Sequence, residues 1–258
     1  MNDDSLTGAR SFVSRVAGRV GRWTVAAAVT TVLVGVVVLY TIQEVRGRRL
    51  EAQLLAAPTW QVARDPALVR FAAEQAKPLF AAYCASCHGG DMKGSRTAGA
   101  PNLVDAVWLY GTGSVFDIER TILFGIRSGN GKARNVTDMT AFGQRGLLSD
   151  GEIRNVVQYV LRLSHRPHQA EAATEGGKVF ADKGECFDCH ARDARGDPDY
   201  GAPDLTANTW SYGGDPETLY KTIYFGRHGI CPAWLGPLDL EQIRALAVYI
   251  YSASHQGT

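Results

Sequence analysis

Two short strings of cysteine and histidine carry the most specific chemistry in this sequence. Each has the spacing C-x-x-C-H, which is the attachment string of c-type haem. Two thiols one helical turn apart can reach the two vinyl groups of a porphyrin, and the adjacent histidine then faces the iron. A structural zinc site would need four ligands, and neither string has a second Cys or His pair nearby. We therefore expect two covalently bound haem c groups. The strings comprise Cys84, Cys87 and His88 in the first and Cys186, Cys189 and His190 in the second.

The two strings belong to an internal repeat. The segment 99–103, Gly-Ala-Pro-Asn-Leu, recurs as Gly-Ala-Pro-Asp-Leu at 201–205, and Trp-Leu-Tyr-Gly at 108–111 recurs as Trp-Ser-Tyr-Gly at 210–213. A repeat of this kind indicates two copies of one structural unit. At about 85 residues each, such units are too small for a generous apolar core, and a covalently held porphyrin would supply buried surface.

Helix signals recur along both copies, and neither copy shows the alternation of polar and apolar residues that is typical of strands. Asp65 followed by Pro66 predicts a helix start, and Pro78 predicts the opening of the segment that leads into the first string. Capping boxes, in which a side chain at the first position and another three residues later satisfy backbone donors, begin at Ser149 and at Asp239. The fold class predicted from these signals is all-α.

An uncharged apolar run of 20 residues extends from Trp23 to Ile42. A bilayer core needs about 20 residues of helix, whereas the apolar core of a cleaved signal peptide has about 7–15. The run therefore predicts a retained transmembrane helix. The predicted organisation is an N-terminal cytoplasmic segment 1–22, a transmembrane helix 23–42, a spacer 43–65, a first class I cytochrome c domain 66–165, a linker 166–174 and a second such domain 175–258.

Haem c is attached outside the cytoplasm, so both domains are expected on the outer side of the membrane with the N-terminus inside. A histidine that binds haem iron usually donates its other ring N–H to a backbone carbonyl. Pro101 and Pro203 each follow their histidine by 13 residues, and a carbonyl near each proline is the expected acceptor.

The sixth iron ligand decides potential and reactivity, and methionine in that position raises the potential. Met139 is the candidate for the first haem, because Met92 follows His88 too closely to cross the ring. The second copy contains no methionine, and Cys231 stands at the aligned position. Three possibilities stay open there: Cys231 binds iron as thiolate and lowers the potential, His228 binds instead, or the site is open.

The sequence closely resembles the di-haem cytochrome c subunit of cbb3-type cytochrome oxidases, the C-family haem–copper oxidases of bacteria. The resemblance rests on the anchor with its Arg-rich exit, the repeated motifs above, and Phe-Gly-Ile-Arg127, Ala141-Phe-Gly, Phe-Gly-Arg227 and Pro232-Ala-Trp. Two departures stand out: Thr140 replaces a proline after the first methionine, and Cys231 replaces the second methionine. The aromatic- and proline-rich stretch that usually precedes the family's anchor is also missing.

The resemblance implies the ligands and the partners. Cys84, Cys87, His88 and Met139 would hold the first haem, and Cys186, Cys189 and His190 the second. The chain would receive electrons from a soluble or membrane cytochrome c, or from the quinol:cytochrome c oxidoreductase. It would pass them to the oxygen-reducing catalytic subunit, in a complex that also holds a mono-haem subunit, in the bacterial inner membrane with the haem domains in the periplasm.

Charge and composition exclude some classes of protein. Residues 170–258 carry 7 Lys and Arg against 13 Asp and Glu, which fits either a docking face for a basic partner or a solvated surface. No basic block indicates nucleic-acid binding. No acid–base dyad stands out, so the chain is expected to be a non-catalytic electron-transfer subunit. The alternatives are a di-haem donor for another periplasmic enzyme, or a haem enzyme or gas sensor acting at the second haem.

Overall fold

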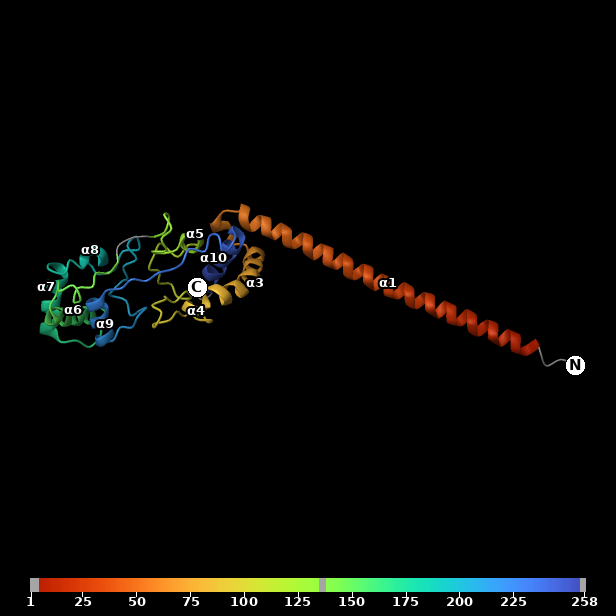
Figure 1. The fold of residues 1–258 in the computed structure, drawn as a ribbon, viewed down its shortest axis with the longest axis horizontal. Coiled ribbons are helices and arrows are strands. Elements are labelled where there is room, and N and C mark those ends of the chain that lie inside the picture. The colour runs from red at the N-terminus through yellow and green to blue at the C-terminus, as the bar shows by residue number, and fades with distance from the viewer. Residues whose placement is uncertain (1–4, 135–137, 256–258) are drawn as a thin grey trace. The chain divides into compact units, whose positions relative to one another are not determined.

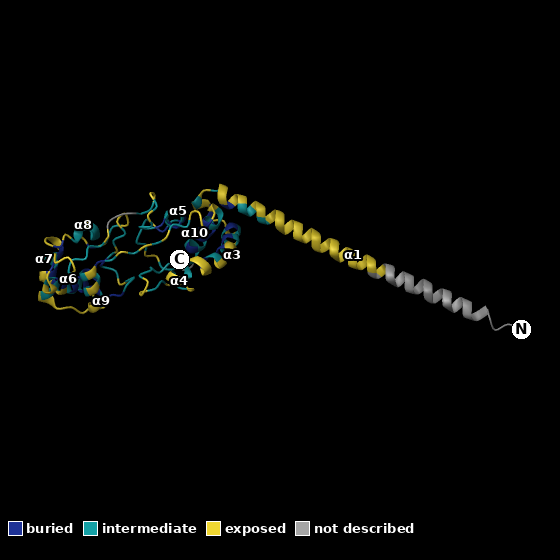
Figure 2. Ribbon diagram, viewed as in Figure 1, coloured by how far each residue is buried: buried dark blue, intermediate teal, exposed yellow. Residues whose placement is uncertain are grey.

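The structure, a computed structural model, describes residues 5–134 and 138–255, without the side chains of residues 5–23 and 25. The chain divides into two compact units, Met1–Ala52 and Gln53–Thr258, and each is described by itself. Helix α1, Ser5–Ala56, begins in the first unit. The part of α1 from Ala26 onward is long and apolar enough to cross a membrane, and its most apolar stretch of 18 residues has a mean hydropathy of 2.0 and contains no buried residue (Figure 2). The predicted span 23–42 lies within this helix, whereas the side chains of the predicted cytoplasmic segment 1–22 fall outside the described ones.

The second unit is built from short helices joined by long loops (Figure 1). The described residues contain isolated β-bridges but no strand, so the all-α prediction is confirmed. The helices are α2 (Thr59–Val62), α3 (Pro66–Tyr83), α4 (Ala85–His88), α5 (Val115–Phe124), α6 (Asp150–Leu163), α7 (Ala170–Ala181), α8 (Phe187–His190), α9 (Pro216–Phe225) and α10 (Leu240–Ser254).

Local capping explains where several of these helices begin. The Asp65 carboxylate accepts the backbone N–H groups of Ala67 and Leu68 at the start of α3. Full capping boxes open α6 at Ser149 and α10 at Asp239. All three starts agree with the sequence prediction, because a cap depends only on residues within one helical turn.

Two local predictions were wrong. Pro78 opens no new segment but lies inside α3, which continues to Tyr83. A proline in a helix interior removes a hydrogen bond, yet α3 buries one apolar face on both sides of Pro78, and this packing keeps the helix continuous. The connection before α7 is also shorter than the predicted linker 166–174. Helix α7 already begins at Ala170, in a run of Ala and Glu that favours helix.

The packing of the helices does not follow the order of the two repeats. Helix α10, from the second repeat, packs against α3 and α5 of the first, while α6, from the first repeat, packs against α7 and α9 of the second (Figure 1). We call α2, α3, α4, α5 and α10 the first module, and α6, α7, α8 and α9 the second module. Each module therefore contains one helix from the other repeat, α10 in the first module and α6 in the second. The predicted domains 66–165 and 175–258 are repeats of the sequence rather than packing units.

Each module has its own apolar core. In the first module, Phe80 of α3 meets Tyr249 of α10 edge to face, with ring centroids 6.2 Å apart. In the second module a cluster of buried side chains joins Ile153 and Val157 of α6 to Phe180 of α7 and Leu219 of α9. The exchange of α6 and α10 is thus stabilised by buried apolar surface, which is the dominant favourable contribution to folding.

Candidate haem sites

The two C-x-x-C-H strings fold alike. Each ends in a one-turn helix, α4 or α8, that presents the histidine. The Nδ1 atom of His88 lies 3.1 Å from the carbonyl oxygen of Pro101, and Nδ1 of His190 lies 3.1 Å from that of Pro203. A carbonyl can only accept, so Nδ1 carries the proton in each ring. The Nε2 lone pair of each histidine is then left to bind a metal, as in haem proteins.

The loops that hold these carbonyls are tied back to the histidines. In the first loop, Gly94 donates its N–H to the carbonyl of His88 at 2.8 Å, and Ser95 and Ala100 exchange two hydrogen bonds of 3.0 Å. In the second, Gly196 donates to the carbonyl of His190 at 2.9 Å, and the equivalent pair 197 and 202 closes the loop. The orientation of each imidazole is therefore fixed by the backbone of its own repeat.

Burial sets the protonation of these groups. It lowers the pKa of both His88 and His190, although the hydrogen bond to proline opposes this effect. It also raises the pKa of Cys84 and Cys186 to about 11. Near neutral pH the imidazoles are neutral, as a metal ligand requires, and these two thiols are protonated.

Met139 lies with the second module. After α5 the chain crosses over, and Met139 and Arg227 exchange backbone hydrogen bonds of 3.2 and 3.3 Å. The next turn is pinned by a bond of 3.1 Å from the Phe142 N–H to the carbonyl of Ile223 in α9. The Met139 side chain packs against the core cluster of the second module, as Cys186 does.

Cys231 lies with the first module. After α9 the chain crosses back, and Cys231 exchanges hydrogen bonds of 2.9 and 3.0 Å with Ile126. Trp234 then donates to the carbonyl of Ile122 in α5 at 2.9 Å. Burial raises the pKa of the Cys231 thiol to about 11, and the nearby Cys87 adds to this effect, so the cysteine faces the first string.

The backbone pairings of Met139 and Cys231 are equivalent in the two repeats. Cys231 pairs with Ile126 and Met139 pairs with Arg227, and Ile126 and Arg227 occupy matching places after α5 and α9. They differ from the sequence-based assignment, which paired Met139 with the first haem and Cys231 with the second. That assignment assumed that the candidate sixth ligand of each repeat lies beside the C-x-x-C-H string of the same repeat. The helix exchange carries each crossing segment to the other string instead.

His228, the alternative iron ligand, takes part in an ion-pair network. Its Nδ1 lies 2.6 Å from one carboxylate oxygen of Asp138, whose other oxygen lies 3.3 Å from Nε of Arg127. The Arg127 Nε also donates to the carbonyl of Gly229 at 2.6 Å. The His228 side chain is 57% exposed. The network joins the two crossing segments to each other.

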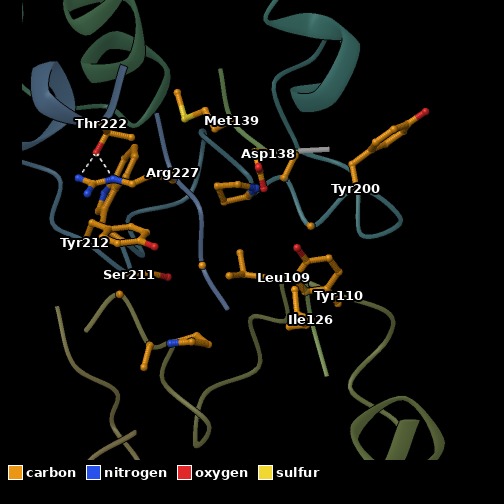
Figure 3. A pocket seen from close by; sticks show the side chains of 18 of the residues that line it. Leu109, Tyr110, Ile126, Asp138, Met139, Tyr200, Ser211, Tyr212, Thr222 and Arg227 are labelled. Atoms are coloured by element: carbon orange, nitrogen blue, oxygen red, sulfur yellow. Dashed lines mark hydrogen bonds between the residues drawn. The ribbon is translucent and has the colours of Figure 1, made fainter. Parts of the chain in front are cut away.

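A cavity of about 1070 Å³ runs between the modules, and its lining includes both C-x-x-C-H strings, Cys231 and both proline loops. Met139 also lines it, together with Tyr110 and Tyr212 (Figure 3). This volume lies slightly above the range for ligand sites, about 300–1,000 Å³. Trp210 also lines it, and its buried Nε1 has no hydrogen-bond partner among the residues that the structure describes. Such an orphaned indole donor suits the carboxylate of a bound haem, so the residues present fit this group.

Comparisons with known proteins show the family of the chain. The family described as "Cytochrome C oxidase, cbb3-type, subunit III" matches residues 71–160 and 171–250, one segment for each repeat. The chain belongs to this family. The cbb3-type oxidase subunit FixP of Bradyrhizobium sp. (strain ORS 278) is 42% identical over 83% of the chain and 72% of its own length. The subunit CcoP of Cereibacter sphaeroides is 37% identical over 78% of the chain and 68% of its own length.

Membership of the cbb3-type subunit III family has direct consequences. Cytochrome c domains imply haem c as the cofactor. The relatives are named as subunits of an oxidase, so a complex with other subunits is implied. With the apolar helix α1, membership also identifies the chain as membrane-anchored.

Sequence reasoning gave no role to several residues of the cavity, although it used their motifs as marks of the repeat. Tyr110 and Tyr212 come from the two Trp-x-Tyr-Gly motifs, and Arg127 and Arg227 from the two Phe-Gly motifs. All four line the cavity. The two tyrosines stand at equivalent positions of the repeats, whereas the two arginines are offset by one residue, because Arg227 aligns with Ile126. The sequence signal that could have identified such cavity residues is a polar or aromatic residue that recurs in both repeats outside the apolar pattern of the helices.

Proposed function

We propose that the chain is the di-haem electron-relay subunit of a cbb3-type terminal oxidase. Cys84 and Cys87 would attach one haem c, and Cys186 and Cys189 the other. His88 and His190 would be the iron ligands adjacent to these strings. The single observation that carries the proposal is the matched geometry of the two histidines, each held at 3.1 Å by a proline carbonyl and both opening onto one cavity.

The sixth ligands are proposed in crossed order. The packing of Met139 against the second core supports Met139 as ligand of the second haem. The pairing of Cys231 with Ile126 supports Cys231 as ligand of the first haem, where a thiolate would lower the potential. The contact of His228 with Asp138 supports a role for His228 in the joint between the crossing segments rather than at iron.

The bound haem supplies one-electron chemistry, and the protein supplies orientation and electrostatics. The proline carbonyls hold the imidazoles, the apolar cavity walls limit access of water, and the buried Trp210 donor would bind a haem carboxylate. Oxygen reduction is assigned to the catalytic subunit. A soluble or membrane cytochrome c, or the quinol:cytochrome c oxidoreductase, is the proposed electron donor, and a mono-haem subunit is a further partner.

The anchor would lie in the bacterial inner membrane, with its N-terminus in the cytoplasm and both haem modules in the periplasm. This orientation is supported by the extracytoplasmic attachment of haem c. A reporter active only in the periplasm, fused after residue 258, should be active, and the same reporter fused before residue 5 should be silent. The reverse pattern would exclude the proposed orientation.

The function is tested by purifying the chain under mild conditions from its own membranes. Mass spectrometry should give the polypeptide plus two covalent haems, and a larger many-helix haem–copper subunit should co-purify. Changing Cys84 and Cys87 to Ser should remove one haem, and changing Cys186 and Cys189 should remove the other. Co-purification with a dehydrogenase alone would favour the donor of another periplasmic enzyme, and a chain without haem would refute electron transfer.

A further inference from the structure

The two glycines that open the proline loops have no room for a side chain. Gly99 and Gly201 both adopt a positive φ, of 63° and 69°. A Cβ at Gly99 would come closer than 3.0 Å to the ring of Tyr212, and a Cβ at Gly201 equally close to the ring of Tyr110. Each tyrosine therefore lies directly against the loop of the other repeat.

These contacts lie two residues from the carbonyls that orient the histidines. Gly201 precedes Pro203, whose carbonyl oxygen lies 3.1 Å from Nδ1 of His190. Gly99 stands in the same relation to Pro101 and His88. Because each loop is closed by its own backbone hydrogen bonds, a displacement at the glycine would be passed on to the imidazole.

Each tyrosine is itself held in place. The Tyr110 hydroxyl accepts a hydrogen bond of 3.0 Å from Nη1 of Arg127, and the next residue, Gly111, donates to the carbonyl of Pro198 in the other repeat at 3.4 Å. The guanidinium carbon of Arg227 lies 3.9 Å from the ring centroid of Tyr212. Figure 3 shows Arg227 beside Tyr212 and bonded to Thr222, at 2.6 and 3.0 Å.

We propose that Tyr110 and Tyr212 are reciprocal positioning residues, each fixing the histidine loop of the other repeat and thereby tuning the haem bound there. The inference rests on the proposed function, since it concerns the same two haems. It adds that the redox properties of each haem depend on a side chain from the opposite repeat. Polar and packing contacts around an iron-binding histidine tune the metal in this way.

The test uses the full chain in its purified complex. Midpoint potentials and low-temperature EPR spectra are measured for both haems in the parent and in Tyr110→Ala, Tyr110→Phe and Tyr212→Ala. Signals are assigned with the variant in which Cys186 and Cys189 are Ser, which lacks the second covalent haem. Tyr200→Ala is the matched control, because this neighbour of Gly201 also lines the cavity but is 41% exposed.

For Tyr110→Ala we expect about a threefold or larger change in the oxidised-to-reduced ratio of the second haem at its parent midpoint, with the first haem unchanged. Tyr212→Ala should give the mirror pattern. Tyr110→Phe, which keeps the ring, and the Tyr200→Ala control should resemble the parent. Tyr110→Leu serves as the test if the alanine variant does not accumulate.

Unchanged potentials and spectra of both haems in the tyrosine variants would overturn the inference, as would an effect on the haem of the same repeat. Equal shifts of both haems would also overturn it, because they would indicate general loosening. Failure of the proposed function would look different, since the parent itself would then lack two covalent haems.

Discussion

The partly buried ion pair between Arg244 and Glu119 offers a quantitative test of how the first module is held together. Arg244 of α10 lies 2.9 Å from the carboxylate of Glu119 in α5, and the two side chains are only 15% and 12% exposed. The same guanidinium donates to the carbonyls of Leu54 and Ala57 at 3.1 and 3.2 Å. One side chain thus joins α5, α10 and the end of α1.

Arg244→Ala should destabilise the unit Gln53–Thr258 strongly. Removing one partner of a buried ion pair costs about 3–5 kcal/mol, and the residual exposure of this pair favours the lower end. For a unit of roughly 150–250 residues, about 3 kcal/mol corresponds to a drop of about 6–12 °C in melting temperature. The double variant Arg244→Leu with Glu119→Leu should recover part of this loss, because it leaves no charge buried alone.

The measurement is thermal unfolding of the detergent-solubilised holoprotein, followed by circular dichroism and by Soret absorbance. Arg195→Ala is the control, because the Nε of Arg195 lies 3.8 Å from Asp193 and both side chains are at least 65% exposed. Exposed pairs of this kind contribute little. A melting temperature for Arg244→Ala equal to that of the control would refute the reasoning.

Three further predictions follow from the site and its supports. Cys231→Met should raise the midpoint potential of the first haem, and Met139→Leu should perturb the second; redox titration that shows the opposite pairing would contradict the crossed ligands. Ile153→Ala should cost about 2–5 kcal/mol in denaturant unfolding, because Ile153 is fully buried in the second core. Glu152, with its pKa lowered to about 2 chiefly by the hydrogen bond from Lys183, contributes stability that is present above pH 4.5 and lost as the pH falls towards 2. Glu152→Gln should therefore flatten the acid dependence of the melting temperature; an unchanged slope between pH 4.5 and 2 would argue against this contribution.

The parts of the fold that depend on neighbouring residues could be predicted from the sequence. The caps at Asp65, Ser149 and Asp239 each involve one helical turn, and the C-x-x-C-H strings are local as well. The equal spacing of Pro101 and Pro203 from their histidines also predicted where to look for the carbonyl acceptors. In all these cases the interacting groups lie within about 13 residues of each other, and no distant segment can change their pairing.

The helix exchange could not be predicted in this way. Helices α6 and α10 both start with a capping box and both present an apolar face, with Ile153 and Ile243 at equivalent positions. Because the repeats are related, either helix fits the helices of either copy by pattern alone. The choice depends on the path of the loops after Gly125 and Gly226, which pair with the opposite repeat. The assignment of Met139 and Cys231 depends on that same choice.

The exchange of α6 and α10 has a consequence for how the protein is made. The partner of α3 is α10, more than 150 residues further along the chain, so the first haem string stands beside an incomplete scaffold until α10 has been synthesised. Contacts so distant in sequence form late and slowly. A polypeptide stopped after residue 165 would hold α3 without α10 and α6 without α7, so neither half is a self-sufficient folding unit. Completion of the first module therefore requires synthesis through α10, even though its haem string lies more than 150 residues earlier in the chain.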